Sequence, residues 1–322
     1  MISGIVIGGA PSSGSSLLND LIGRHSVIRS FPETHLLAKP VLWGNWNKHK
    51  EKLLSQKWKS PDWHLHSGVS HITESELAEQ AIKGSSSVLE FAHRYFSEIA
   101  KQQGKQIWCE KTPANVYFFN QLKHDSITIK PVLCIRNPFD IIASLLFRNM
   151  NLIDAVSRTL INFGVGHAQL KKSEIITIKY EDLVTNPELC LQNLFQQLDI
   201  EFENQLLENR NGNTKMDGWK HAEDGVISKS SIGRFSELTT KQQSDVIYAT
   251  EKIKLNRTHL EAYGLQMETD DECTLSFLAK HYNYIMPEIE GTFVELSTHI
   301  LADKLKRKIK AYPSANPYPI TL

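Results

Sequence analysis

Two short segments of this sequence carry residue types that suit the binding of anions. The first is the glycine- and serine-rich run Gly8–Ser16 (GGAPSSGSS), which follows a β-branched stretch. A loop between a strand and a helix holds anions with its backbone N–H groups and the helix N-terminus; a serine-rich helix cap without a ligand is the alternative. From Gly9 the run fits the P-loop pattern G-x-x-x-x-G-K-[ST], except that Ser15 replaces the lysine. Because that lysine contacts the β- and γ-phosphates, its absence disfavours an ordinary NTPase or kinase.

The second segment, Arg136–Asp140 (RNPFD), directly follows an apolar, β-branched run. Its Asn-Pro pair is typical of a helix start. Ser144 and Arg148 continue from Asp140 at four-residue steps, so we expect them to share one helical face. Because a bidentate arginine suits a phosphate monoester, Arg136, Ser144 and Arg148 form a second candidate anion site. The alternative is a capped helix with surface arginines.

Short β-branched runs alternate with helical patterns along the chain. Strands are predicted at Gly4–Gly8, Val27–Ser30, Gln106–Glu110, Pro131–Ile135 and Glu174–Lys179. Helices are predicted at Ser15–Arg24, Val88–Gln103, Ala114–Lys123, Pro138–Met150, Ile153–Lys171, Glu188–Leu198 and Thr240–Tyr263. This alternation predicts an α/β, P-loop-like three-layer fold with a central parallel sheet flanked by helices. In such sheets ligands bind beyond the carboxyl ends of the strands, where both anion motifs lie.

Composition narrows the class of protein. The 322 residues include 36 Lys+Arg and 36 Asp+Glu, and this zero balance argues against a non-specific nucleic-acid binder. No apolar run is long enough to predict a membrane span. Four widely spaced cysteines and an N-terminus without signal-peptide features predict a cytoplasmic protein.

In combination, the motifs resemble the family of sulfotransferases that use 3′-phosphoadenosine 5′-phosphosulfate (PAPS). The run PSSGSSLL is similar to the 5′-phosphosulfate loop P-[KR]-S-G-T-[ST], and RNPFD with Ser144 is similar to the 3′-phosphate motif R-[DN]-P-x-D-x-x-x-S. Glu110–Pro113 (EKTP), Tyr180–Leu183 (YEDL) and Ile232–Phe235 (IGRF) follow the order seen in bacterial and tyrosylprotein-type members. The resemblance covers roughly residues 4–265.

The resemblance implies two groups of PAPS-binding residues. The loop residues expected at the 5′-phosphate are Ser12, Ser13, Gly14, Ser15 and Ser16. The residues expected on the 3′-phosphate side are Arg136, Ser144, Arg148, Ser231, Gly233 and Arg234, and Tyr180 is expected near the nucleotide. Amides, hydroxyls and cations would then stabilise the developing charge, and no metal is expected.

Ser12 departs from the family pattern, because most relatives carry Lys or Arg there. That cation normally lies at the sulfuryl group, and loss of such a stabiliser commonly costs about 10²–10³ in rate. Three alternatives stay open: Ser12 donates a hydrogen bond while Lys111 supplies the charge, a Lys or Arg from elsewhere takes its place, or the protein is slow or altered. For Lys111, the structural alternative is a salt bridge to Glu110 or another carboxylate.

Transfer to an acceptor also needs a base, within about 2.6–3.2 Å of the proton it removes. In the tyrosylprotein-type branch a Glu at this place is the base, so Glu33 is the first choice. His35 is the second, since the cytosolic branch uses a His and His titrates near neutrality, and His93 is the third. A buried Glu33 that only positions its loop is the structural alternative.

Two regions differ from the α/β pattern. A Trp- and His-rich cap, about residues 38–75, is expected to be inserted in the α/β domain of residues 1–265 and to recognise the acceptor; simple core packing is the alternative. Within the cap, His64-x-His66 lacks the further ligands of a metal site. Residues 266–322 are expected to form a helical C-terminal extension.

These motifs predict a PAPS-dependent sulfotransferase that releases 3′-phosphoadenosine 5′-phosphate (PAP). The acceptor would be a hydroxyl or amine of a small molecule, peptide or saccharide. Two alternatives remain: a degenerate P-loop phosphotransferase that uses ATP, and a nucleotide-binding protein without catalysis. The oligomeric state stays open, with a homodimer as one option.

Overall fold

The computed structural model describes residues 2–44, 46–54, 75–170, 172, 174–208 and 226–255. The chain divides into two compact units. The sheet unit comprises Met1–Gly9, Gly14–Cys134 and Ser173–Ser228, and the helix unit comprises Ala10–Ser13, Ile135–Lys172 and Lys229–Leu322.

The sheet unit is built on a five-stranded sheet in the order β2-β3-β1-β4-β5. Its strands are β1 (Gly4–Gly9), β2 (Ile28–Phe31), β3 (Ile107–Lys111), β4 (Ile129–Ile135) and β5 (Ile176–Lys179). The central strand β1 pairs in parallel with β3 and with β4, and β2 pairs in parallel with β3. All residues of β1 are buried, as expected for a parallel strand that helices cover on both faces.

The helices of the sheet unit follow these strands in sequence. They are α1 (Ser15–Gly23), α2 (Pro40–Gly44), α3 (Trp46–Leu54), α5 (Ser75–Lys83), α6 (Val88–Gln102), α9 (Tyr180–Thr185) and α10 (Pro187–Leu198), with 3₁₀ helices η2 (Pro113–Gln121) and η3 (Asn204–Leu207). Apolar residues of α1 and α10, such as Leu21 and Phe195, form one buried cluster with Ile5 and Ile7 of β1. Burial of this cluster stabilises the sheet on that face.

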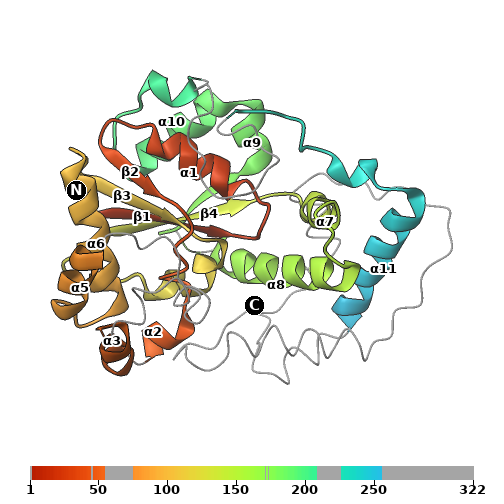
Figure 1. Ribbon diagram of the computed structural model, residues 1–322. Helices are drawn as coiled ribbons and strands as arrows, with labels where there is room; N and C mark the ends of the chain where they lie inside the picture. Colours follow the sequence, from red (N-terminus) through yellow and green to blue (C-terminus); the bar gives the residue numbers. More distant parts are fainter. Residues whose placement is uncertain are drawn as a thin grey trace. The chain divides into compact units, whose positions relative to one another are not determined.

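The side chains of β3 show how helices cover both faces of the sheet. Successive residues of a strand point to opposite faces. Trp108 packs against Phe96 of α6, with 5.4 Å between the ring centroids, whereas the thiol of Cys109 lies 3.4 Å from Asn19 Oδ1 of α1. Gly4 of β1 leaves room for the indole, because a Cβ at position 4 would lie 2.3 Å from Trp108 Cε2. In Figure 1, α1 accordingly lies above the strands and α6 below them.

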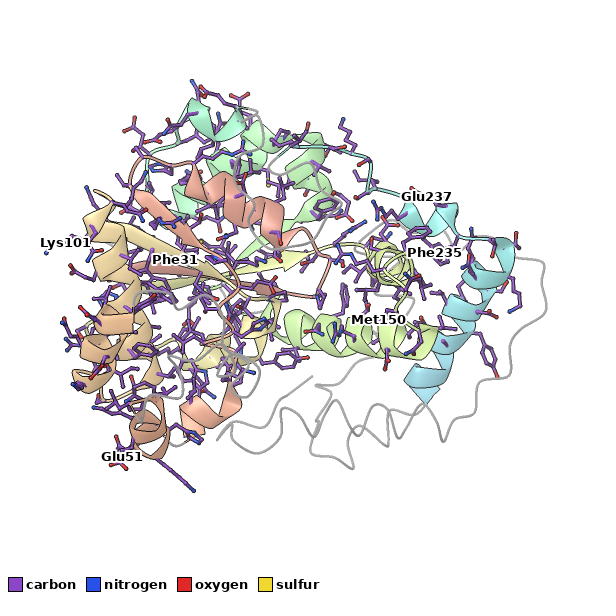
Figure 2. The ribbon with its side chains drawn as sticks, in the orientation of Figure 1. Phe31, Glu51, Lys101, Met150, Phe235 and Glu237 are labelled. Atoms are coloured by element: carbon purple, nitrogen blue, oxygen red, sulfur yellow. The ribbon has the colours of Figure 1, made fainter. Side chains whose placement is uncertain are left out.

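The helix unit consists of α7 (Pro138–Leu146), α8 (Leu152–Leu170), the 3₁₀ helix η4 (Arg234–Glu237) and α11 (Thr240–Leu255). Helix α7 contacts both α8 and η4, and α8 contacts α11. Phe235 of η4, labelled in Figure 2, is buried against Phe139 of α7 with 5.0 Å between ring centroids. This aromatic pair fixes η4 next to the first turn of α7.

The predicted fold class is confirmed: the chain is an α/β protein with a parallel sheet flanked by helices. The helix predicted at Ala114–Lys123 is instead a 3₁₀ helix. Helix α7 ends at Leu146 rather than at Met150, because Asn149 takes a left-handed conformation, with φ of 59°. The Met150 N–H then donates to the Leu145 carbonyl at 3.1 Å, which is a common way to end a helix.

Part of the predicted organisation falls outside the described residues. These parts are the C-terminal extension, residues 266–322, and the middle of the Trp- and His-rich cap, including His64 and His66. In the described part of the cap, Trp43 stacks on Phe118 and the Trp46 indole donates to the Ser85 carbonyl at 3.1 Å. Both indoles therefore have contacts within the sheet unit, and recognition of the acceptor by the cap stays a prediction.

Candidate active site

The strand order predicts a ligand site at the residues that follow β1 and β4. The chain leaves β1 through α1 toward β2 on one side, and leaves β4 toward β5 on the other. In open α/β sheets, ligands bind at the carboxyl ends of the two strands where the connections diverge in this way. Those ends carry the serine-rich loop and Arg136, the two anion motifs of the sequence.

In the sheet unit, the first turn of α1 is closely packed at its N-cap. Gly14 is the N-cap residue, with a left-handed φ of 90°. A Cβ at this position would lie 2.2 Å from Cδ2 of Tyr180, so only glycine fits between the loop and that buried ring. Tyr180, predicted to lie near the nucleotide, thus packs directly on the loop.

Lys111 ends β3 at the same turn of α1. Its side chain is 1% exposed, and its Nζ donates to Ser16 Oγ at 3.0 Å. It also forms an ion pair with Oε1 of Glu33, from the loop after β2. The predicted salt bridge of Lys111 is therefore made with Glu33 rather than with Glu110, and the same ammonium lies at the serine-rich loop.

The two foremost candidates for the base share the loop after β2. The other oxygen of Glu33, Oε2, lies 3.7 Å from Nε2 of His35. Burial lowers the pKa of His35 below its usual value, an effect that outweighs the opposing charges of Glu33 and Glu110. Its side chain is nevertheless 42% exposed, so His35 is mainly neutral near pH 7 and accessible to an acceptor.

His93, the third candidate, is hydrogen-bonded to the Trp108 side chain. Its Nδ1 accepts a hydrogen bond from the Trp108 indole at 3.1 Å. Trp108 precedes Lys111 by three residues on β3, a separation of about 10 Å along a strand. The structure thus brings Glu33, His35 and Lys111 together and places His93 on α6, beside Trp108.

The helix unit holds the second anion motif. Arg136 is 4% exposed; its Nη1 donates to the Ser12 carbonyl at 2.8 Å and its Nη2 to the Ser231 carbonyl. The arginine therefore joins the serine-rich loop to the segment that leads into η4. Ser12 itself takes a left-handed conformation, with φ of 67°, which is disfavoured for a residue with a side chain.

Buried polar atoms in the helix unit mark a place for a ligand. Ser144 on α7 is 2% exposed, and its Oγ has no hydrogen-bond partner among the residues that the structure describes. The same holds for Ser12 Oγ and Arg234 Nε. Unsatisfied buried groups of this kind cost about 1–3 kcal/mol each, so they fit a site whose anionic ligand supplies the missing acceptors.

Comparison with known proteins identifies the family of this chain. A sequence model of the sulfotransferase family matches residues 4–204. The chain belongs to the sulfotransferase family. The matched part of this sulfotransferase contains the serine-rich loop, Glu33, Lys111, Arg136 and Tyr180. The matched part ends before Ser231, so the evidence that the segment leading into η4 contacts Arg136 comes from the structure alone.

The solved structure of one sulfotransferase domain supports the fold. The sulfotransferase domain of the Synechococcus PCC 7002 olefin synthase is 18% identical, with a TM-score of 0.50 over 79% of this chain and 94% of that one. The sulfotransferase domain from the curacin biosynthetic pathway is 20% identical, with a TM-score of 0.49 over 89% and 99% of the two chains. A comparison with curated proteins found no significant match.

The structure also places two further predicted site residues. Arg148, predicted to share a helical face with Ser144, is exposed and lies in the turn directly after α7. Arg234 lies over the Phe147 ring, with its Cζ 5.9 Å from the centroid.

Sequence reasoning missed the role of Asp140. Its Oδ2 accepts from the Gly233 N–H at 2.9 Å and its Oδ1 from the Phe235 N–H at 3.0 Å. The carboxylate thereby holds η4 against α7. The spacing of the RNPFD and IGRF motifs carries no signal of this contact, because the two are 93 residues apart.

Two further features concern a membrane-spanning helix and a metal-binding cluster. Among the described residues, no helix combines the length and hydropathy needed to cross a bilayer. The described residues also contain no cluster of three or more His, Cys, Asp or Glu side chains suited to a metal ion.

Proposed function

We propose that this sulfotransferase transfers the sulfuryl group of PAPS to a hydroxyl or amine of an acceptor and releases PAP. The observation that carries the proposal is Lys111, a buried ammonium that contacts both Ser16 of the loop and Glu33. A cation at the loop and a carboxylate beside it are the two charges that sulfuryl transfer requires. The family membership of the chain supports the same reaction.

The residues divide the proposed chemistry between them. PAPS, when bound, supplies an activated sulfuryl group on its 5′-phosphate. Ser13, Gly14, Ser15 and Ser16 would hold that phosphate through amides and hydroxyls, with Ser12 beside them. Arg136 and Ser144 would hold the 3′-phosphate, and Ser231, Gly233 and Arg234 would close over it. Arg148, in the exposed turn after α7, would have at most an auxiliary role.

In the transfer, the acceptor oxygen or nitrogen forms a bond to sulfur while the bond from sulfur to the 5′-phosphate oxygen breaks. Lys111 would neutralise the charge that develops on the departing phosphate and so replace the cation missing at Ser12. Glu33 would take the acceptor proton, which makes it a base whose position Lys111 fixes. His35 is the second candidate, because it is exposed and mainly neutral near pH 7.

Glu33→Gln and His35→Gln separate these two roles. We expect Glu33→Gln to lower kcat by about 10²–10⁴, the usual contribution of general base catalysis, and His35→Gln to lower it far less. The measurement is transfer of ³⁵S from labelled PAPS to a panel of phenols, alcohols, sugars, amines and tyrosine peptides. The opposite order of effects would assign the base to His35.

The same panel tests the proposed function. Labelled product with at least one acceptor supports it, whereas PAP binding without transfer to any acceptor would favour a nucleotide-binding protein without catalysis. Mg²⁺-dependent ATP binding tighter than PAP binding would favour the phosphotransferase. A cytoplasmic location is part of the proposal and is tested by fractionation of cells.

A further inference from the structure

Glu110, the residue before Lys111 on β3, is a fully buried carboxylate. Its Oε1 accepts from the Thr34 N–H at 3.1 Å, the Thr34 hydroxyl at 2.8 Å and the Thr112 hydroxyl at 2.7 Å. Its Oε2 accepts from Asn115 Nδ2 at 2.7 Å, and that amide also donates to the Ile7 carbonyl at 3.0 Å. All four contacts are donors, which suits a carboxylate because it only accepts.

The hydrogen bonds around Glu110 fix three consecutive amides of the loop after β2. The Thr34 N–H donates to Glu110, the His35 N–H donates to Thr112 Oγ1 at 3.1 Å, and the Leu36 N–H donates to Thr34 Oγ1 at 3.2 Å. The two hydroxyls that accept from His35 and Leu36 both donate to Glu110 in turn. Each of these amides is therefore held directly or through one hydroxyl by a single carboxylate.

His35 needs such support because of its backbone conformation. Its φ is 56°, in the left-handed region that a residue with a Cβ rarely adopts. Disfavoured conformations persist where the surrounding structure over-determines them. The bond from the His35 N–H to Thr112, together with the bond from the Ala38 N–H to the His35 carbonyl at 3.2 Å, supplies that constraint.

Glu110 and Lys111 hold the same loop from two sides of the sheet. As neighbours on β3 they point to opposite faces. Lys111 binds the side chain of Glu33, whereas Glu110 binds the backbone and hydroxyl of Thr34. The side chain of Glu33 and the backbone beside it are thus fixed by consecutive residues of one strand.

We infer that Glu110 is a positioning residue, which acts through Thr34 and Thr112 to hold Glu33 and His35 in place for proton removal. The role of this loop in proton removal rests on the proposed function. The role of Glu110 in fixing the backbone of the loop does not. Glu110 itself is buried behind this loop and reaches no solvent. Its removal should therefore lower kcat while leaving donor binding nearly unchanged.

The test uses the full chain with Glu110→Gln and Thr112→Val, and with Thr112→Ser as the matched control that keeps the hydroxyl. Hydrogen exchange of the amides of residues 32–38 is measured by mass spectrometry without any ligand. We expect exchange at least about tenfold faster in both variants, since a weaker network makes local opening easier. Gln removes the charge of the acceptor and places an NH₂ group against Asn115 Nδ2, and Val removes the acceptor of the His35 N–H. Thr112→Ser should exchange like the wild type.

Calorimetry with PAP and the ³⁵S assay complete the test. Misplacement of a reacting group by about 1 Å can cost about 10²-fold, so kcat should fall by about 10- to 100-fold in the same two variants. The PAP dissociation constant should stay within about twofold, since donor-binding residues are untouched. Thr112→Ser should restore kcat, which a loss of general stability would not explain.

Unchanged exchange at residues 32–38 in Glu110→Gln and Thr112→Val would overturn the inference. A loss of PAP binding equal to the loss of kcat would also overturn it, because Glu110 would then support the whole unit rather than the loop. Absence of any sulfuryl transfer by the wild type would instead contradict the proposed function. In that case the exchange measurement still decides the role of Glu110.

Discussion

The cations at the two anion motifs of this sulfotransferase, Lys111 and Arg136, have contrasting partners. In the sheet unit, the cation Lys111 is matched by a carboxylate, Glu33. In the helix unit, the cation Arg136 donates to the carbonyls of Ser12 and Ser231, and the hydroxyl of Ser144 has no partner among the described residues. The first arrangement suits proton transfer, and the second suits the binding of an anion.

This contrast bears on the serine at position 12. A cation there would lie in the loop itself, whereas Lys111 reaches the loop from β3. Because Lys111 is already fixed by two contacts, little reorganisation is needed when charge develops beside it. The replacement of the usual Lys or Arg by Ser12 is therefore compatible with catalysis.

The largest effect is expected from Lys111→Ala. The variant loses the only cation that we assign to the sulfuryl group and leaves Glu33 without this partner, so kcat should fall by at least about 10²–10³. PAP carries the 5′-phosphate on which that charge develops, so its affinity should also fall, by about 10- to 100-fold, and by less than kcat. Steady-state kinetics with labelled PAPS and calorimetry with PAP measure the two quantities.

Lys111→Arg is the control for this variant, since it keeps the charge and should recover part of the activity. Equal losses of PAP affinity and of kcat in Lys111→Ala would contradict the difference in role between Lys111 and Arg136. Lys111 would then be a donor-binding residue rather than a catalytic one.

Arg136→Ala tests the other motif, the one assigned to the 3′-phosphate. Loss of a charged hydrogen-bonding group costs about 1.5–3 kcal/mol, so PAP affinity should fall by about 10- to 100-fold. The affinity for adenosine 5′-phosphosulfate, which lacks the 3′-phosphate, should barely change. Equal losses for the two ligands would show that Arg136 only holds the carbonyls of Ser12 and Ser231.

Ser144→Ala is expected to act in opposite directions on stability and on binding. The buried hydroxyl has no partner in the described structure, so its removal should raise the free energy of unfolding by up to about 1 kcal/mol. PAP affinity should nevertheless fall by about five- to tenfold if the hydroxyl donates to the 3′-phosphate. Chemical denaturation and calorimetry test the two signs, and destabilisation with unchanged affinity would contradict the assignment.

The smallest effect concerns pH. Burial lowers the pKa of His35 in the folded protein, while Lys39 and Lys111 lower it further and Glu33 and Glu110 raise it. The unfolded chain therefore binds this proton more readily, and the wild type loses stability as the pH falls below about 6.5. In His35→Gln this loss should be smaller, as denaturation at pH 5 and pH 8 would show. An identical pH dependence in the two proteins would contradict the direction of the shift.

Much of the fold could be predicted because its signals are local. Apolar, β-branched runs located all five strands, and the cap and turn residues located the starts of α1 and α7. The ends of helices were harder to place: Asn149 ends α7 by adopting a left-handed conformation that its sequence neighbours do not require.

The candidate residues of the site were found by motif, but their partners were not. Glu33 and Lys111 are 78 residues apart in sequence, so their ion pair depends on the pairing of β2 with β3. The same is true of Glu110 and Thr34, which are 76 residues apart. Sequence motifs identify residues that do chemistry, whereas the contacts that position those residues arise from the sheet register.

The most direct test of the central claim, that the donor is PAPS, is calorimetric titration of the wild-type chain with PAP, ADP and ATP side by side. We expect PAP to bind more tightly than ADP or ATP, with no requirement for Mg²⁺, because Arg136 and Ser144 are assigned to a 3′-phosphate that only PAP carries. Equal affinity for PAP and ADP, or Mg²⁺-dependent ATP binding tighter than either, would contradict it.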